Sequence, residues 1–189
     1  MIDPLPVLVA RGALALLFAF AARHKLRDID AFRRALEGYE LLPSLWAVPA
    51  GALLIAGELG IAVGLCLPRV APAASVAAAL LLGLYGWAIA INLRRGRRDL
   101  DCGCGGPARR QTISAWLVWR NGLLAVVALA AALPPSSRAL TWLDGGTLLA
   151  AVGALALLYA AADGLLANAP GVARLRPHDH QAEAEGSHA

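Results

Sequence analysis

The chain has 189 residues, of which 59% are apolar and 16% are charged, and its mean hydropathy is +0.61. A soluble domain averages about 45–50% apolar and about 25% charged residues, so this composition indicates a membrane protein. The formal net charge of +4 does not indicate a nucleic-acid partner, because the basic residues cluster in short segments between apolar runs, as in multi-pass membrane proteins.

Five apolar segments are long enough to cross a bilayer, whose hydrocarbon core needs roughly 20 mostly apolar residues per helix. They are residues 5–22, 48–67, 71–93, 113–133 and 140–166. The sequence therefore predicts an all-α integral membrane helical bundle of about five transmembrane helices. This domain would cover residues 1–168, and a disordered polar tail would follow over residues 169–189.

The segment after the first span has an amphipathic pattern of its own. Its apolar residues recur at helical spacing, while charged residues fall on the other faces. These apolar residues are Ile29, Phe32, Leu36 and Tyr39. The pattern predicts a short helix, with Asp28 or Asp30 capping its start. Such a helix either lies in the membrane interface or packs on the end of the bundle.

Lys and Arg are unevenly divided between the two sides of the predicted bundle. Residues 23–47, residues 94–112 and the tail together hold thirteen, whereas the opposite side holds two, Arg69 and Arg138. The positive-inside rule then predicts an N-terminus outside the cell and a C-terminus in the cytoplasm. The first span is expected to be an anchor rather than a cleaved signal peptide, because its basic residues follow the apolar run. The expected location is a bacterial inner membrane.

The sequence Leu-Asp-Cys-Gly-Cys-Gly-Gly, residues 100–106, carries the most reactive side chains of the chain. Arginines on both sides favour the thiolate, which is the reactive form of cysteine, whereas Asp101 acts against it. Glycines allow this loop to turn tightly. They are Gly103, Gly105 and Gly106.

Three interpretations of Cys102 and Cys104 are open. In the favoured one they are a redox pair: one sulfur attacks a partner's disulfide and the other resolves the mixed disulfide. A bridge between cysteines one residue apart would be strained and therefore oxidising. In the second they are half of a tetrahedral metal site, whose other half is missing. In the third they are inert residues of a turn.

The remaining candidate ligands give no further site. The third cysteine, Cys66, ends the second span on the opposite side and is expected to be a small apolar residue. Three cysteines also exclude a secreted disulfide framework, which needs an even number. His178 and His180 in the tail would hold a metal only weakly, so no metal site is predicted.

Glu58 lies near the middle of the second span, where ionisable groups are costly and usually face a partner or a cavity. Arg120 and Arg11 are its candidate partners. Asn92 and Asn121 would complete a polar cluster beneath the cysteines. Such a cluster would hold the cysteine loop or bind a head group such as a quinone; equally, it would be an ion pair that fixes helix register.

Four stretches, in this order and spacing over about residues 8–130, resemble the MauE branch of the DoxX-like membrane proteins. They are HKLRDIDAFRRALEGYELLP, GELGIAVGL, AINLRRGRRDLDCGCGG and ISAWLVWRNGLL. The Cys-Gly-Cys element is the most specific of the matching features. Gly105 departs from the family pattern, which has an aromatic residue at this position.

The resemblance implies a four-helix core with one further helix, and a part in maturing methylamine dehydrogenase. That periplasmic enzyme has a disulfide-rich small subunit with a tryptophan-derived quinone. Cys102 and Cys104 would exchange electrons with a membrane-anchored thioredoxin-like partner, and no resident cofactor is expected. Glu58, Arg120 and Asn121 match intramembrane polar positions of the family. Two alternatives remain: a non-catalytic anchor and assembly subunit, or a subunit of a quinone-linked oxidoreductase.

Overall fold

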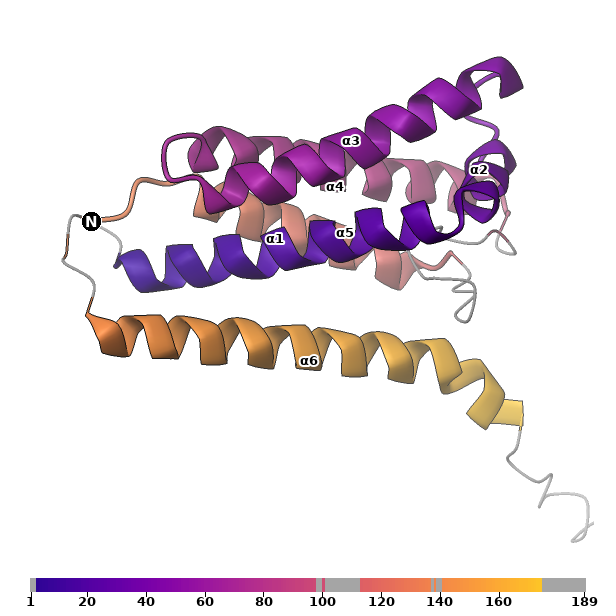
Figure 1. Ribbon diagram of the computed structural model, residues 1–189. Helices are drawn as coiled ribbons and strands as arrows, with labels where there is room; N and C mark the ends of the chain where they lie inside the picture. The colour runs from indigo at the N-terminus through magenta and orange to yellow at the C-terminus, as the bar shows by residue number, and fades with distance from the viewer. Residues whose placement is uncertain (1–2, 98–99, 101–112, 137, 139–140, 175–189) are drawn as a thin grey trace, which may run out of the picture. The chain divides into compact units, whose positions relative to one another are not determined.

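The computed structural model describes residues 3–97, 100, 113–136, 138 and 141–174 (Figure 1). The chain divides into two units, residues 1–156 and residues 157–189. Every regular element among the described residues is helical, which confirms the predicted all-α fold. In chain order the elements are α1 (Pro4–Arg27), α2 (Ile29–Gly38), the 3₁₀ turn η1 (Ser44–Trp46), α3 (Ala47–Cys66), α4 (Ala71–Arg94), α5 (Ala115–Ala131) and α6 (Trp142–Arg174).

Each of the five predicted spans corresponds to a helix. Among the described residues, four segments are long and apolar enough to cross a membrane: Pro4–Arg27, Ser44–Cys66, Ala71–Arg94 and Trp142–Ala162. The fifth, α5, is apolar but has only 17 residues, shorter than the predicted span over 113–133. The last helix continues through residues 169–174, where a disordered tail was expected. The protein is thus a multi-pass membrane protein.

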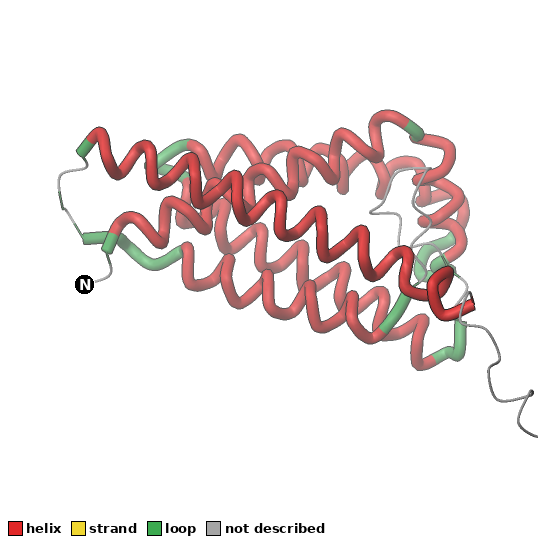
Figure 2. Tube along the Cα trace, turned by 90° about the horizontal axis from the view of Figure 1, so that it is seen from below, coloured by secondary structure: helices red, strands yellow, loops and turns green. Residues whose placement is uncertain are grey.

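The first unit contains α1 to α5 and the beginning of α6, and its core lies between α1, α3, α4 and α5. These four helices run side by side along a common direction (Figures 1 and 2). Leu14 and Phe18 of α1 meet Ile61, Leu65 and Leu82 of α3 and α4 in one apolar cluster. A second, smaller cluster at the end that carries α2 consists of Tyr39, Ile89, Ile113 and Leu117.

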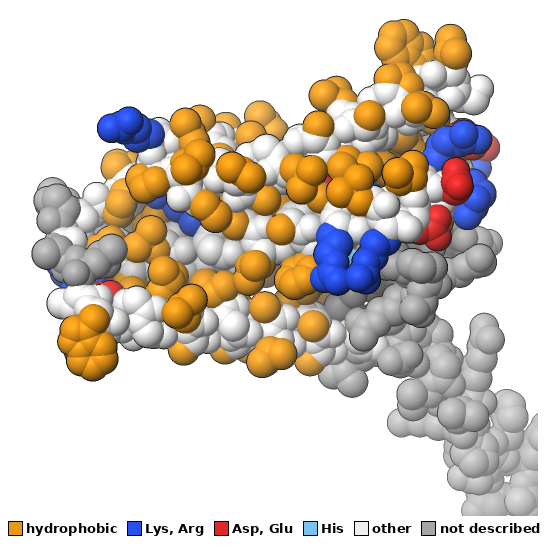
Figure 3. Space-filling view, in the orientation of Figure 1, with side chains coloured by type: hydrophobic (Ala, Val, Ile, Leu, Met, Phe, Trp, Pro, Cys, Tyr) orange, Lys and Arg blue, Asp and Glu red, His pale blue; other side chains and the backbone are white. Residues whose placement is uncertain are grey.

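The outer faces of the helices are apolar too, as expected where lipid rather than water surrounds the protein. Leu53, Leu80 and Leu123 are among the many large apolar side chains that point away from the core. Figure 3 shows hydrophobic side chains over much of the visible face, and most of the visible charged side chains lie toward the end that carries α2. Exposed Trp46 and Trp119 lie near that same end, as in the aromatic belt of a membrane interface.

The predicted amphipathic helix is α2. Asp28 ends α1 and caps α2, because its carboxylate accepts a hydrogen bond from the backbone N–H of Ala31 at 2.9 Å. The apolar face of α2 packs on α3: a Cβ at Gly51 would lie 3.3 Å from the Phe32 ring and 3.8 Å from Leu36. Of the two alternatives for this helix, the geometry favours packing on the end of the bundle.

Candidate functional site

A buried ion pair joins the last turn of α1 to the middle of α3. The Lys25 ammonium group donates a hydrogen bond to Oε1 of Glu58, and the two side chains are only 3% and 0% exposed. Glu58 is therefore the buried ionisable group that the sequence predicted. Its partner is Lys25, a residue that the sequence pattern did not mark as a candidate.

Two aromatic side chains complete the surroundings of this pair. The Tyr85 hydroxyl on α4 donates a hydrogen bond to the same Glu58 Oε1 at 2.7 Å. The Lys25 nitrogen lies 5.2 Å from the centroid of the Tyr85 ring and 5.4 Å from that of Phe32 on α2. Both distances are within cation–π range. Side chains from α1, α2, α3 and α4 thus meet at one ammonium group; we call Lys25, Phe32, Glu58 and Tyr85 the polar lock.

The hydrogen bonding of the polar lock is uneven. Glu58 Oε1 accepts from both donors, whereas the buried Oε2 has no hydrogen-bond partner among the described residues. A carboxylate has room for about four donors, so this oxygen is an unusual feature of a buried site. The Glu58 carboxylate therefore accepts fewer hydrogen bonds than it could.

The burial of Lys25 follows from its place on α1. Residues at intervals of three and four form the buried stripe of that helix, which includes Val7, Leu14, Phe18 and Ala22. Lys25 continues this stripe by one more turn. The periodicity was therefore a signal for a buried lysine, although its position among basic residues after the first span made it look like a flanking charge.

Arg11 does not belong to the polar lock, and the expected pairing with Glu58 is wrong for this residue. Its Nε donates to the backbone carbonyl of Ala131, at the far end of α5, at 3.0 Å. Arg11 and Lys25 are fourteen residues apart on α1, which corresponds to about 21 Å along a helix. Arg120, the other candidate partner, lies half-buried on α5.

Asn92 and Asn121 are buried as expected, but each amide bonds to its own helix. Asn92 Nδ2 donates to the Ala88 carbonyl at 3.1 Å, and Asn121 Nδ2 donates to the Leu117 carbonyl at 2.8 Å. Asn121 also fixes the contact between α5 and α4, because its Cβ lies 3.5 Å from a Cβ built at Gly86. The side-chain amide of each residue therefore bonds to a backbone carbonyl and not to the Glu58 carboxylate.

The segment with the Cys-Gly-Cys element starts and ends at a hydrogen-bonded pair. The backbone N–H of Ile113 donates to the carbonyl of Leu100 at 3.0 Å. Ile113 belongs to the small apolar cluster with Tyr39, Ile89 and Leu117, and Leu100 packs against it. Cys102 and Cys104, with Asp101, Gly103, Gly105 and Gly106, lie outside the described residues, as do His178 and His180.

A polar latch connects the two long loops beside this pair. Arg97 after α4 forms an ion pair with Glu40 after α2 at 2.7 Å, and Nη1 of Arg95 donates to the Glu40 carbonyl at 3.5 Å. Glu40 has a φ of 48° and Gly96 a φ of 75°, both in the left-handed region. A non-glycine residue in that region is uncommon, so the latch holds a specific turn.

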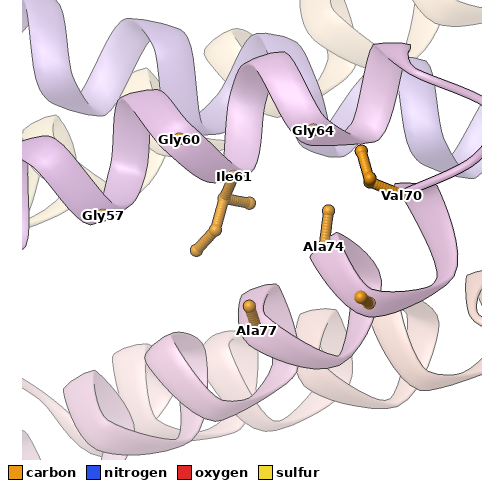
Figure 4. Close-up of a pocket in the computed structure, with 8 residues that line it drawn as sticks. Gly57, Gly60, Ile61, Gly64, Val70, Ala74 and Ala77 are labelled. Carbon is orange, nitrogen blue, oxygen red and sulfur yellow. The ribbon is translucent and has the colours of Figure 1, made fainter.

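Cys66 lies at the other end of α3, exposed, with its thiol donating to the Ala62 carbonyl at 3.5 Å. An apolar groove of about 440 Å³ runs between α3 and α4 toward that end (Figure 4). Its lining contains only apolar residues and therefore offers no acid, base or ligand: Gly57, Gly60, Ile61, Gly64, Val70, Ala73, Ala74 and Ala77. Among the described residues no three His, Cys, Asp or Glu side chains gather in a metal-binding arrangement.

Comparisons with known proteins agree with the resemblance of the sequence. A family model described as methylamine utilisation protein MauE matches residues 4–134. The methylamine utilization protein MauE of Paracoccus versutus is 40% identical over 183 residues, which cover 92% of this chain and 96% of the relative. The protein of that name from Paracoccus denitrificans is 37% identical over 163 residues, covering 86% and 88%.

A further relative, from Methylorubrum extorquens, is 41% identical over 126 residues, covering 67% of this chain and 68% of its own. No solved structure matches the chain. The family match covers all four helices of the polar lock and therefore each of its four residues. From these matches, the chain belongs to the MauE family of methylamine utilisation proteins.

Proposed function

We propose that this protein supports the maturation of the methylamine dehydrogenase small subunit, or of a similar periplasmic redox enzyme, by thiol–disulfide exchange through Cys102 and Cys104. The observation that carries the proposal is the hydrogen bond between Ile113 and Leu100, which brings the two ends of the Cys-Gly-Cys segment together. Membership of the MauE family supports the connection to methylamine utilisation.

The exchange needs no cofactor bound by this chain. One cysteine thiolate attacks a disulfide sulfur of a thioredoxin-like partner, forms a mixed disulfide and releases one partner thiolate. The second cysteine then attacks its neighbour's sulfur, so the Cys102–Cys104 disulfide forms and the partner leaves as a dithiol. Run against a reduced client, the same steps in reverse transfer the disulfide to the client and regenerate the two thiols. Two electrons move in each cycle.

The direct test replaces both cysteines with serine in a host whose growth on methylamine depends on this protein. We expect the Cys102→Ser/Cys104→Ser variant to accumulate in the membrane but to leave the small subunit with free thiols. The measurements are methylamine dehydrogenase activity and the subunit's disulfide content by mass spectrometry. Cys66→Ser is the matched control, because Cys66 is an exposed cysteine at the other end of α3, and it should change neither readout.

Full maturation with the double variant would overturn the exchange and leave a non-catalytic assembly role. The single variants add a second readout. Removal of the resolving cysteine should trap a mixed disulfide with the partner, visible as a reducible adduct on a non-reducing gel. The identity of the adduct tests the thioredoxin-like partner directly.

A further inference from the structure

We infer that the polar lock is a positioning site for the Cys102–Cys104 pair, an inference that rests on the proposed function. Lys25 is its central residue. Its ammonium group is held by Glu58 from α3 and lies against the rings of Tyr85 from α4 and Phe32 from α2. Lys25 of α1 therefore contacts side chains of α2, α3 and α4 at one point.

Stability alone gives a poor account of such a pair. Removing two charges from water is costly, and well-packed apolar residues of similar volume are often as stable as a buried ion pair or more so. The unpartnered Oε2 of Glu58 makes the cost larger. What a buried pair provides, and an apolar pair does not, is a single helix register, because only one alignment of α1 and α3 brings the two charges together.

The register set by the polar lock reaches the cysteine segment through α4 and α5. Tyr85 lies one helical turn from Ile89, which packs with Ile113 and Leu117. Next to Tyr85, Gly86 receives Asn121 of α5, whose amide bonds to the Leu117 carbonyl. The contacts are continuous from Glu58 to Ile113, where the segment ends.

A second route runs through α2 to the other end of the segment. Phe32 contacts both the Lys25 ammonium and Gly51 of α3, so it fixes α2 on the bundle. At the end of α2, a Cβ at Gly38 would lie 3.5 Å from the side chain of Leu100. Both anchors of the segment, Leu100 and Ile113, therefore rest on helices that the polar lock aligns.

The test separates register from stability with an apolar double variant, Lys25→Met/Glu58→Met, made in a Cys66→Ser background. The purified protein in detergent is equilibrated with buffers of reduced and oxidised glutathione, and the Cys102–Cys104 disulfide is measured by maleimide labelling and mass spectrometry. We expect the double variant to keep its melting temperature, while its glutathione equilibrium constant changes by about tenfold or more. Tyr85→Phe, which removes only one hydroxyl, should change the constant in the same direction by a smaller factor.

The matched control is Arg33→Gln/Glu37→Gln, which removes an exposed ion pair within α2, with a 3.2 Å separation, and should leave the constant unchanged. An unchanged constant in both the double variant and Tyr85→Phe would overturn the inference. If the double variant fails to fold, Tyr85→Phe decides alone. Failure of the proposed function would look different, because the wild-type pair itself would then form no disulfide in any glutathione buffer.

Discussion

Lys25 is the one lysine of the sequence, and its burial makes it a reporter for the polar lock. An amine-reactive ester should modify Lys25 in the folded protein at least about tenfold more slowly than in the denatured chain, because modification requires local opening. Peptide mass spectrometry after timed labelling in detergent measures this ratio. Glu58→Gln should remove most of the protection, since the ammonium group then loses its carboxylate.

The outcome that contradicts this prediction is equal labelling of Lys25 in folded and denatured protein. Arg33→Gln serves as the comparison for Glu58→Gln, because it breaks an exposed pair and should leave the protection intact. Because the sequence has one lysine, a label on a lysine side chain is assigned to Lys25 without ambiguity.

Sequence reasoning found half of the buried pair and missed the other half for a physical reason. Glu58 was conspicuous because a carboxylate in the middle of an apolar span is costly. Lys25 follows the first apolar run among other basic residues, where a charge is ordinary. Periodicity places a residue on a face of its helix, but the height of one helix against another depends on tertiary contacts. In the fold, α3 extends beyond the end of α1 (Figure 1), so Glu58 lies level with the last turn of α1.

The helices themselves were largely predictable. The amphipathic spacing gave α2 and its apolar face, and Asp28 was a recognisable cap. What the spacing could not give was the surface that this face covers. Phe32 and Leu36 pack on Gly51, a position in the predicted second span that has no side chain to oppose them.

The second prediction concerns the close packing of α3 on α4, near the turn that joins the two helices. A Cβ at Gly64 would lie only 2.9 Å from the Cβ of Ala74, and neither atom is at the end of a flexible side chain. Gly64→Ala should therefore push the helices apart and cost about 1–3 kcal/mol of unfolding free energy. Thermal unfolding in detergent, followed by tryptophan fluorescence, measures the loss.

Gly60→Ala is the control for this substitution, one turn earlier on the same helix. No described atom lies within 4 Å of a Cβ built at Gly60, which faces the apolar groove of Figure 4. The added methyl should then leave stability unchanged or raise it by up to about 1 kcal/mol, since alanine favours the helix. Equal losses for the two variants would show that the close approach at Gly64 does not limit stability.

Over the whole molecule, composition and span length were sufficient to predict a multi-pass helical bundle, and family motifs were sufficient to predict its relatives. Orientation rests on charge alone. Lys and Arg concentrate on the side of α2 and of the Cys-Gly-Cys segment, which the positive-inside rule assigns to the cytoplasm. The proposed client matures in the periplasm, so the side from which the cysteines react decides how electrons reach it.

The chain contains its own pair of reporters for this orientation. Cys66 is exposed at the end of α3 opposite to the two long loops, so Cys66 and the Cys102–Cys104 pair should lie on opposite sides of the membrane. A membrane-impermeant maleimide, applied after reduction, should label Cys66 in spheroplasts of the Cys102→Ser/Cys104→Ser variant. It should label Cys102 and Cys104 only in inverted vesicles of the Cys66→Ala variant.

Labelling of Cys102 and Cys104 from the outer face would reverse the predicted topology and place the exchange directly in the periplasm with its client. Labelling from the cytoplasmic face would confirm the predicted topology and exclude direct exchange with a periplasmic client; the pair would then exchange with a cytoplasmic thiol donor or acceptor.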